Sequence, residues 1–520
     1  MPIPAPRLRR PLAVALLLAL LLALSLSAGA AQEAQPARWE TLWDRWYTLE
    51  LAGATAGWMH ETASTDGSRY RAAAESAFKV SRGPVELEVT MSSVFLETHQ
   101  GRPLELHFVQ DMALQSMDTR WLFSDDKVLS ISRQGGREIR KEHPLPEEPW
   151  LTPMAVHRFW IDQRKANAED ITYRTISGES GLSPVTVRHV LVGEEKAALE
   201  GRDVPVTVWQ TTNSMMPQIT STSKYTAEGY LVQEEVALPF GRMVTRLATK
   251  EEAMALGAGP APELMMQTFI EVDKPIENAR SARNAVFRLR VREGDMPDLP
   301  SAGAQRVEPG EDGKSALLKV NIDENLPAGA EDRANADYRE RSAMADSSDE
   351  LIVKLAARAC ADAPDEAMAR AEALRRFVYE HISGKDLDTA FASASETARM
   401  KTGDCSEHGV LLCAMLRAEG IPARVASGLV YADAFAGEKD IFGWHMWTQA
   451  LIEGKWVDFD ATLEDRYDAA HVLTGTSSLA EGVGESDLAS MLMLIGNLEI
   501  EVVKVGDAVP GEKREAQPVP

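Results

Sequence analysis

The chain reads TGDCSEHGVLL from residue 402 to residue 412, and this stretch predicts the start of a buried helix. Asp404 closes a loop, and its carboxylate is well suited to accept the open backbone N–H groups of a first helical turn. Apolar residues then recur at helical spacing until Gly420, which ends the helix, and Pro422 prevents it from resuming. We therefore expect a helix from about Cys405 to just before Gly420.

Cys405 is the first or second residue of this predicted helix. The partial positive charge at a helix N-terminus favours a thiolate over a thiol, which is one way to activate a cysteine nucleophile. Backbone N–H groups of the same turn are able to hold a developing oxyanion. The other two cysteines, Cys360 and Cys413, lie on apolar helical faces and are expected to be buried and unreactive.

A second stretch, FGWHMWTQALIEGKWVDFDAT at residues 442–462, predicts a β-hairpin. Two apolar and aromatic runs flank Glu453-Gly454, which is typical of a two-residue turn. With this turn, His445 and Asp460 point to the same face on diagonal positions, whose backbones lie roughly 7–8 Å apart. A cysteine nucleophile, a histidine base and an aspartate that orients the base form a relay, so the predicted catalytic residues are Cys405, His445 and Asp460.

Each partner in this relay has an alternative. Asp458 points to the same face as Asp460 but lies farther from His445, so it is the alternative orienting residue. A one-residue slip of the turn would move Asp460 to the other face. His408 lies three residues after Cys405 on the same helix, so it would sit beside the nucleophile rather than across a cleft from it. A metal site is a poorer interpretation, because Cys405, His408 and His445 lack paired short spacings and an ion would consume the nucleophile.

Several segments together resemble the transglutaminase-like superfamily, and in particular its exported bacterial branch. The resemblance covers about residues 350–505 and implies a papain-like core, in which the cysteine helix packs on an antiparallel sheet that bears the histidine and the aspartate. It assigns the catalytic roles to Cys405, His445 and Asp460. The segments are Gly403–His408, Gly420–Val425, Trp444–Trp447, Trp456–Thr462, Asp468–Val472 and Leu494–Ile500.

The sequence departs from the family pattern at two places. Ala461 stands where the family usually has proline, and no tryptophan or glutamine shortly before Cys405 completes an oxyanion hole, so its second donor is unassigned. The calcium ligands of some animal members have no visible counterpart. We therefore expect neither a cofactor nor a metal.

Most of the chain before this core alternates apolar and polar residues with the period of a β-strand. Val85, Leu87 and Val89 alternate with glutamate and threonine, for example. The expected fold class is therefore α+β, with a large antiparallel β domain, a sandwich or open barrel, preceding the core. The predicted parts are 31–256 for this β domain, a linker at 257–262, a small β module at 265–325, the catalytic core at 340–505 and a disordered tail at 506–520.

The composition excludes several classes of protein. The 520 residues carry a net charge of −24, which argues against binding to nucleic acid and against docking on an anionic membrane through protein charge. Three cysteines are too few for a disulfide scaffold or a four-thiolate zinc site.

The first thirty residues predict a signal peptide. A basic segment with Arg7, Arg9 and Arg10 precedes an almost unbroken Leu/Ala run, and Ala28-Gly29-Ala30 offers small residues for cleavage. The alternative is an uncleaved membrane anchor, because the apolar run approaches the length needed to span a bilayer. We expect an exported protein, periplasmic or extracellular, with no stable membrane insertion after cleavage.

These features together predict a cysteine-dependent acyl-transfer enzyme that acts on amide bonds of a protein or peptide through a thioester. Transfer to an amine would make it a transglutaminase, and transfer to water a protease or amidase, because the same triad serves both. A third possibility is a non-catalytic binding or scaffold protein of the cell envelope, since one fold hosts several functions.

Overall fold

The computed structural model describes residues 38–506, and antiparallel strands arranged in three sheets dominate it. The predicted signal peptide, most of the predicted linker and the tail after residue 506 lie outside the described residues. Also omitted within this range are residues 83–84, 113–114, 135–136, 147–148, 200, 218, 239–240, 256–260, 264, 266–267, 386–391 and 481–493.

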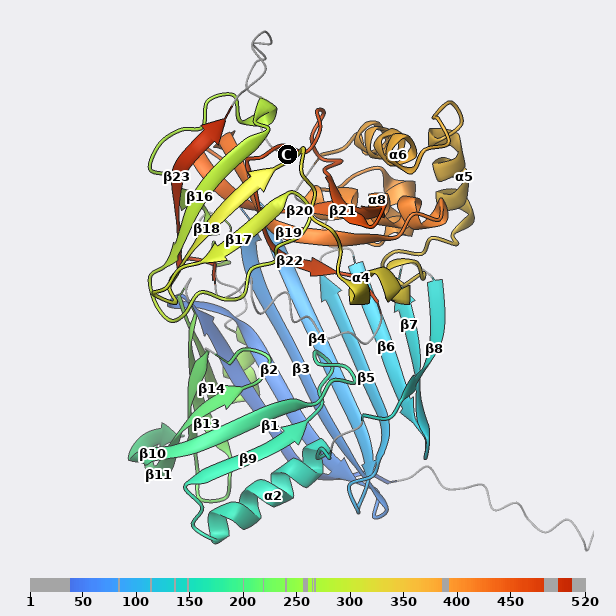
Figure 1. Ribbon diagram of the computed structural model, residues 1–520. Helices are drawn as coiled ribbons and strands as arrows, with labels where there is room; N and C mark the ends of the chain where they lie inside the picture. The colour runs from blue at the N-terminus through green and yellow to red at the C-terminus, as the bar shows by residue number, and fades with distance from the viewer. Residues whose placement is uncertain are drawn as a thin grey trace, which may run out of the picture.

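The N-terminal half forms one curved antiparallel sheet of 14 strands, in the order β8 to β1 followed by β14 to β9 (Figure 1). This is a single continuous sheet rather than the two stacked sheets of a sandwich. The strands are β1 (Glu40–Leu51), β2 (Ala54–Thr65), β3 (Arg69–Arg82), β4 (Val85–Thr98), β5 (Pro103–Met112), β6 (Gln115–Phe123), β7 (Lys127–Gln134), β8 (Arg137–Pro144), β9 (Asp170–Thr175), β10 (Val185–Leu199), β11 (Arg202–Asn213), β12 (Thr220–Tyr225), β13 (Leu231–Leu238) and β14 (Gly241–Ala248).

The alternation seen in the sequence gives this sheet one apolar face. In β4, for example, Leu87 and Val89 are buried whereas Glu86 and Glu88 are exposed. Two helices accompany the sheet, α2 (Pro153–Lys165) between β8 and β9, and α3 (Lys250–Ala255) after β14. One apolar cluster on the sheet contains Phe95, Leu106, Phe108, Trp121, Phe123, Val128 and Ile176.

A second, four-stranded sheet joins distant parts of the chain. Its order is β17-β18-β16-β23, so the last described strand pairs with residues of the predicted small module. Phe287 of this sheet packs edge-on against Phe442 of the third sheet, with ring centroids 5.5 Å apart. The strands are β16 (Asn284–Val291), β17 (Gln305–Pro309), β18 (Ser315–Asn321) and β23 (Leu498–Gly506).

The third sheet has the order β15-β20-β19-β22, with β21 paired to β20, and the helices between residues 350 and 418 lie beside it (Figure 1). Helix α8 is buried from Ser406 to Arg417 and contacts β20 and the other three helices. The elements are β15 (Ile270–Glu271), α5 (Glu350–Ala359), α6 (Ala367–His381), α7 (Ala394–Met400), α8 (Cys405–Ala418), β19 (Ala423–Phe435), β20 (Glu438–Ile452), β21 (Lys455–Phe459) and β22 (His471–Ser477).

The architecture is therefore α+β, as the sequence predicts. The shorter elements between the sheets are η3 (Ala279–Ser281), α4 (Ala330–Ala334) and η4 (Ala336–Tyr338). Within the part of the chain that the structure describes, no helix has both the length and the apolar character needed to cross a bilayer. Figure 1 shows the two smaller sheets and helices α5 to α8 together at one end of the large sheet.

Candidate active site

The hairpin predicted around Glu453-Gly454 is present in the predicted register. β20 and β21 pair with Gln449 opposite Asp458, which makes Glu453-Gly454 the two-residue turn. Both turn residues have positive φ, 50° and 75°, as a type I′ turn requires. Asp460 directly follows the end of β21, so this turn decides where its carboxylate lies relative to β20.

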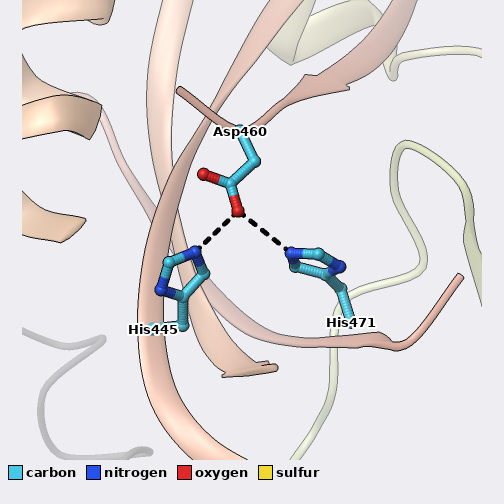
Figure 2. Close-up of side chains that lie close together, drawn as sticks. All are labelled: His445, Asp460 and His471. Carbon is cyan, nitrogen blue, oxygen red and sulfur yellow. Dashed lines mark hydrogen bonds and ion pairs between the residues drawn. The ribbon is translucent and has the colours of Figure 1, made fainter. Parts of the chain in front are cut away.

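His445 and Asp460 form a buried hydrogen-bonded pair (Figure 2). His445 Nε2 lies 2.7 Å from Asp460 Oδ2, and the other carboxylate oxygen accepts the Thr462 backbone N–H at 2.8 Å. Burial alone would raise the pKa of Asp460, but the imidazoles of His445 and His471 outweigh it and hold this pKa well below its ordinary value. Asp460 is therefore a carboxylate, and His445 Nε2 donates to it, which directs Nδ1 away from Asp460.

A second imidazole, His471 at the start of β22, contacts the same carboxylate oxygen. His471 Nε2 lies 3.2 Å from Asp460 Oδ2, and its Nδ1 lies 3.0 Å from the backbone O and 3.2 Å from Oδ1 of Asp468. Burial would lower the pKa of His471, but the two carboxylates together raise it to about 9. In the sequence the Asp468–Val472 segment contributes only to the family resemblance, and no local pattern predicts that His471 contacts Asp460.

Two arginines far away in the sequence hold the segment that follows β21. Arg375 of α6 donates from Nη1 to the backbone O of Leu463 at 2.9 Å and of Asp460 at 3.3 Å. Arg280 of η3 forms an ion pair of 2.9 Å with Asp468. Because Arg375 is almost fully buried, its guanidinium donates hydrogen bonds to this loop rather than to water, and it thereby holds the loop in place.

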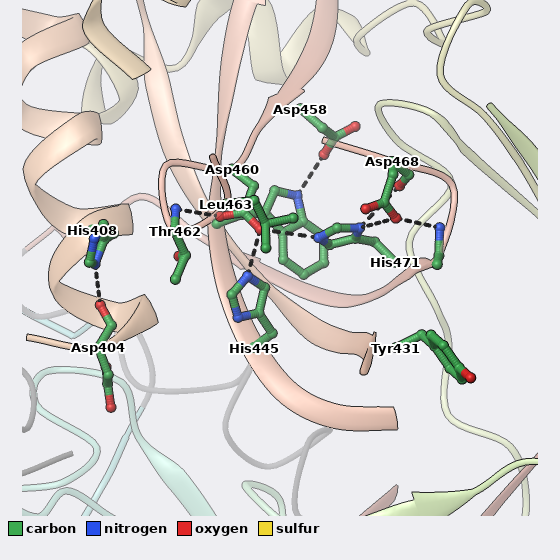
Figure 3. A network of polar contacts seen from close by, with 12 residues as sticks. Asp404, His408, Tyr431, His445, Asp458, Asp460, Thr462, Leu463, Asp468 and His471 are labelled. Carbon is green, nitrogen blue, oxygen red and sulfur yellow. Dashed lines mark hydrogen bonds and ion pairs between the residues drawn. The ribbon is translucent and has the colours of Figure 1, made fainter. Parts of the chain in front are cut away.

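Cys405 is the first residue of α8, as predicted, and Asp404 is the N-cap. The helix packs on the strand that carries His445, because Thr448 of β20 donates its hydroxyl to the backbone O of Gly409 at 2.9 Å. Figure 3 shows Asp404 and His408 of this helix end on one side of His445 and His471 on the other. α8 and β20 thus bring the predicted nucleophile and base to one region of the fold.

The helix start differs from the sequence expectation in one respect. Asp404 Oδ1 accepts the Ser406 backbone N–H at 2.9 Å, and the Asp404 side chain also accepts the N–H of Glu407 in a capping box. The Asp404 side chain therefore satisfies both of these backbone N–H groups. Of the backbone N–H groups that the sequence offers to an oxyanion in this turn, those of Ser406 and Glu407 are therefore taken by the cap.

Glu407 completes the capping box as a buried acid. It accepts the backbone N–H of Asp404 at 2.9 Å and of Ala392 at 2.8 Å. Burial, followed by the neighbouring Asp404 carboxylate, raises the pKa of Glu407 to about 8. Glu407 is therefore largely protonated at neutral pH, so it adds little negative charge beside the predicted thiolate of Cys405.

The raised pKa of Glu407 leads to a prediction about how the stability of the protein depends on pH. A group that binds its proton more tightly in the folded state stabilises the fold fully below its unfolded pKa, and this contribution is lost as the pH rises towards about 8. We expect Glu407→Gln to remove this loss. The wild-type protein should lose about 2–3 kcal/mol more than the variant between pH 5.5 and pH 8, measured as the free energy of unfolding in urea. An equal loss of unfolding free energy in both proteins would contradict a raised pKa for Glu407.

The two alternative partners have other roles. His408 is fully buried, and its Nδ1 donates to the backbone O of Asp404 at 2.7 Å. Burial lowers the pKa of His408 to about 4, so the ring is neutral at pH 7. Asp458 accepts the indole N–H of Trp447 at 2.8 Å and the side-chain amide N–H of Gln449 at 2.7 Å. Its hydrogen bonds therefore link β21 to side chains of β20.

His445, Asp460 and His471 also place one possible metal-ligand atom each within 4.8 Å of one another. Their hydrogen bonds favour another interpretation. Nε2 of each imidazole faces the same Asp460 oxygen, at 2.7 and 3.2 Å, so each nitrogen presents a proton there rather than a lone pair for an ion. The three residues fit a buried chain of hydrogen bonds better than a metal centre.

A capped cysteine helix beside a sheet that carries a buried histidine–aspartate pair defines the class of protein. The model of the transglutaminase-like superfamily matches residues 353–461, a segment that contains Cys405, His445 and Asp460 but not His471. The chain thus carries a transglutaminase-like superfamily domain, which indicates a family of cysteine-dependent enzymes. No curated protein matches the sequence.

Three solved structures resemble parts of the chain at low identity. A β-barrel-like protein of a domain of unknown function from Brucella abortus has 13% identity and a TM-score of 0.32, over 40% of this chain and 95% of its own. A proposed cysteine protease from Cytophaga hutchinsonii has 15% identity and a TM-score of 0.25, over 44% and 90%. A proposed protease from Parabacteroides distasonis has 10% identity and a TM-score of 0.18, over 72% and 68%. At these TM-scores the similarities carry no conclusion about fold or activity.

Proposed function

We propose that this protein is a cysteine-dependent acyl-transfer enzyme that acts on carboxamide groups of proteins or peptides through a thioester intermediate. The observation that carries the proposal is the buried His445–Asp460 pair, 2.7 Å apart, whose histidine lies on the strand against which the Cys405 helix packs. In this proposal the core has a papain-like arrangement, and the mature protein works outside the cytoplasm after export.

The first half of the reaction forms the thioester. His445 Nδ1 takes the proton of Cys405, and the helix N-terminus and the imidazolium stabilise the resulting thiolate. The thiolate sulfur attacks the carboxamide carbon, and the carbonyl electron pair moves to oxygen. The tetrahedral intermediate then collapses, the C–N bond breaks, and the leaving ammonia or amine takes its proton from the His445 imidazolium.

The second half transfers the acyl group to an acceptor. His445 removes a proton from an amine or a water molecule, which attacks the thioester carbon and releases the Cys405 thiolate. Asp460 keeps the proton of His445 on Nε2 throughout, so that Nδ1 remains the nitrogen that exchanges protons with the reactants. An amine acceptor gives transamidation, and water gives hydrolysis.

A product analysis by mass spectrometry tests the proposal. Mature protein is incubated with a peptide library rich in glutamine, with and without a labelled primary amine, beside a matched Cys405→Ala variant. Labelled glutamine indicates transamidation, conversion of glutamine to glutamate indicates an amidase, and new peptide termini indicate a protease. We expect one of these products with the wild-type chain and none with the variant. Products that persist in Cys405→Ala would contradict the proposed nucleophile, and their absence from both proteins would contradict this substrate class.

A further inference from the structure

Behind His445, charged groups of alternating sign form a chain through the protein that ends at the partly exposed Arg280. Asp460 is followed by His471, and His471 by Asp468 (Figure 3). Asp468 in turn forms an ion pair with Arg280 of η3. Asp460, His471 and Asp468 are all 1% exposed or less. Burying the charge of a histidine is costly unless the charge is paired, and the carboxylates of Asp460 and Asp468 supply that pairing for His471.

The acceptors around His471 show that both ring nitrogens carry protons. Nδ1 faces the backbone O and a carboxylate oxygen of Asp468, and Nε2 faces a carboxylate oxygen of Asp460. A neutral imidazole has a single N–H, so one of its lone pairs would face an oxygen that can only accept. The imidazolium avoids this repulsion.

We propose that His471 is a cationic positioning residue, which holds the Asp460 carboxylate in place and takes up part of its negative charge, so that Asp460 orients His445 but stabilises its imidazolium less strongly. This inference rests on the proposed function. The shared atom carries the argument, because His445 and His471 hydrogen-bond to the same oxygen, Asp460 Oδ2. Because the His471 cation offsets part of the negative charge of Asp460, the carboxylate stabilises a positive charge on His445 less strongly.

The distance between the two rings gives the size of the effect. Their centroids lie 5.8 Å apart, and at an effective dielectric constant of about 20 a unit charge at this distance changes a proton equilibrium by about two pH units. The other titratable or charged groups around His471 are Tyr467, whose ring centroid is 4.3 Å away, Asp458 on β21, and Arg280 beyond Asp468.

The test replaces His471 by glutamine, which retains an N–H donor but carries no charge. The rate at which iodoacetamide alkylates Cys405 is measured from pH 4 to pH 10 by peptide mass spectrometry, so no substrate is required. Loss of a nearby positive charge disfavours the thiolate and favours the His445 imidazolium. We therefore expect both transitions in the profile to move towards higher pH, the one that belongs to His445 by about two pH units. Tyr467→Phe, which keeps the ring beside His471, is the matched control and should leave the profile in place.

Failure of this inference can be told apart from failure of the proposed function. If wild-type Cys405 reacts like an ordinary thiol and His445→Ala does not alter its profile, the proposed function is wrong. If the wild-type profile depends on His445 but folded His471→Gln leaves both transitions unchanged, the role of His471 alone is wrong.

A second measurement covers the case in which His471→Gln does not fold. In ¹⁵N spectra of histidine-labelled wild-type protein, we expect one imidazole to stay doubly protonated from pH 5.5 to pH 8, and this signal should titrate at lower pH in Asp468→Asn. Spectra in which every imidazole loses a proton within this range would overturn the proposal.

Discussion

Replacing His445 by alanine is expected to lower the rate of product formation by about 10⁵-fold or more, which is the largest effect we predict. The imidazole serves both halves of the reaction, since it takes the proton from Cys405 and later returns it to the leaving amine. When residues act as one unit, the loss of one member costs nearly as much as the loss of all. Rates are measured on a glutamine peptide found in the product analysis.

The matched control for this prediction is His408→Asn. Asparagine can place its amide N–H close to the position of His408 Nδ1 and retain the 2.7 Å hydrogen bond to the backbone O of Asp404. We expect this variant to keep most of the activity, with unchanged circular dichroism in both proteins. Full activity in His445→Ala, or loss of activity only in His408→Asn, would show that the base has been assigned to the wrong histidine.

The parts of the site that could be predicted from the sequence depend on local geometry. The N-cap Asp404 and the stop at Gly420 determine the helix that begins at Cys405, because each acts on neighbouring backbone groups. The turn at Glu453-Gly454 fixes the hairpin register, because a two-residue turn leaves a single pairing for the strands that it joins. The predicted pairing of His445 with Asp460 depends on that register.

The parts that could not be predicted depend on contacts between distant segments. Arg280 reaches Asp468 from a segment about 190 positions earlier in the chain, and Arg375 reaches the loop after β21 from helix α6. Sequence periodicity does not predict such contacts, because each joins residues that lie far apart along the chain. The pairing of β23 with β16 was missed for the same reason.

The contact between His471 and Asp460 lies between these two cases. Both residues belong to one stretch of the sequence, and an Asp-x-x-His spacing at Asp468–His471 is visible in it. What the sequence does not give is the path of the loop between β21 and β22, which turns His471 back onto the carboxylate. An ionisable pair with short spacing after a predicted catalytic aspartate is therefore worth testing as part of the site.

Replacing Asp460 by asparagine should lower the rate of the chemical step by about 10²–10⁴-fold, in line with the equivalent change in a serine-protease relay. Asparagine has a similar size but no charge, and its amide is able to donate to His445 Nε2. The imidazole would then hold its proton on Nδ1, the nitrogen that must accept a proton from Cys405. The loss should be strongly non-additive with His445→Ala, because an imidazole that is absent cannot be misoriented.

Asp458→Asn separates this role from a structural one. Asp458 also accepts the Ala304 backbone N–H at 3.0 Å, in addition to the side chains of Trp447 and Gln449, so an amide at this position would oppose one of its three donors. We expect Asp458→Asn to lower the melting temperature and to leave the pH profile of Cys405 alkylation in place. Asp460→Asn should change that profile, because the field on His445 changes. Near-wild-type rates in Asp460→Asn together with loss of the chemical step in folded Asp458→Asn would transfer the orienting role to Asp458, and the hydrogen bond between His445 and Asp460 would then be structural.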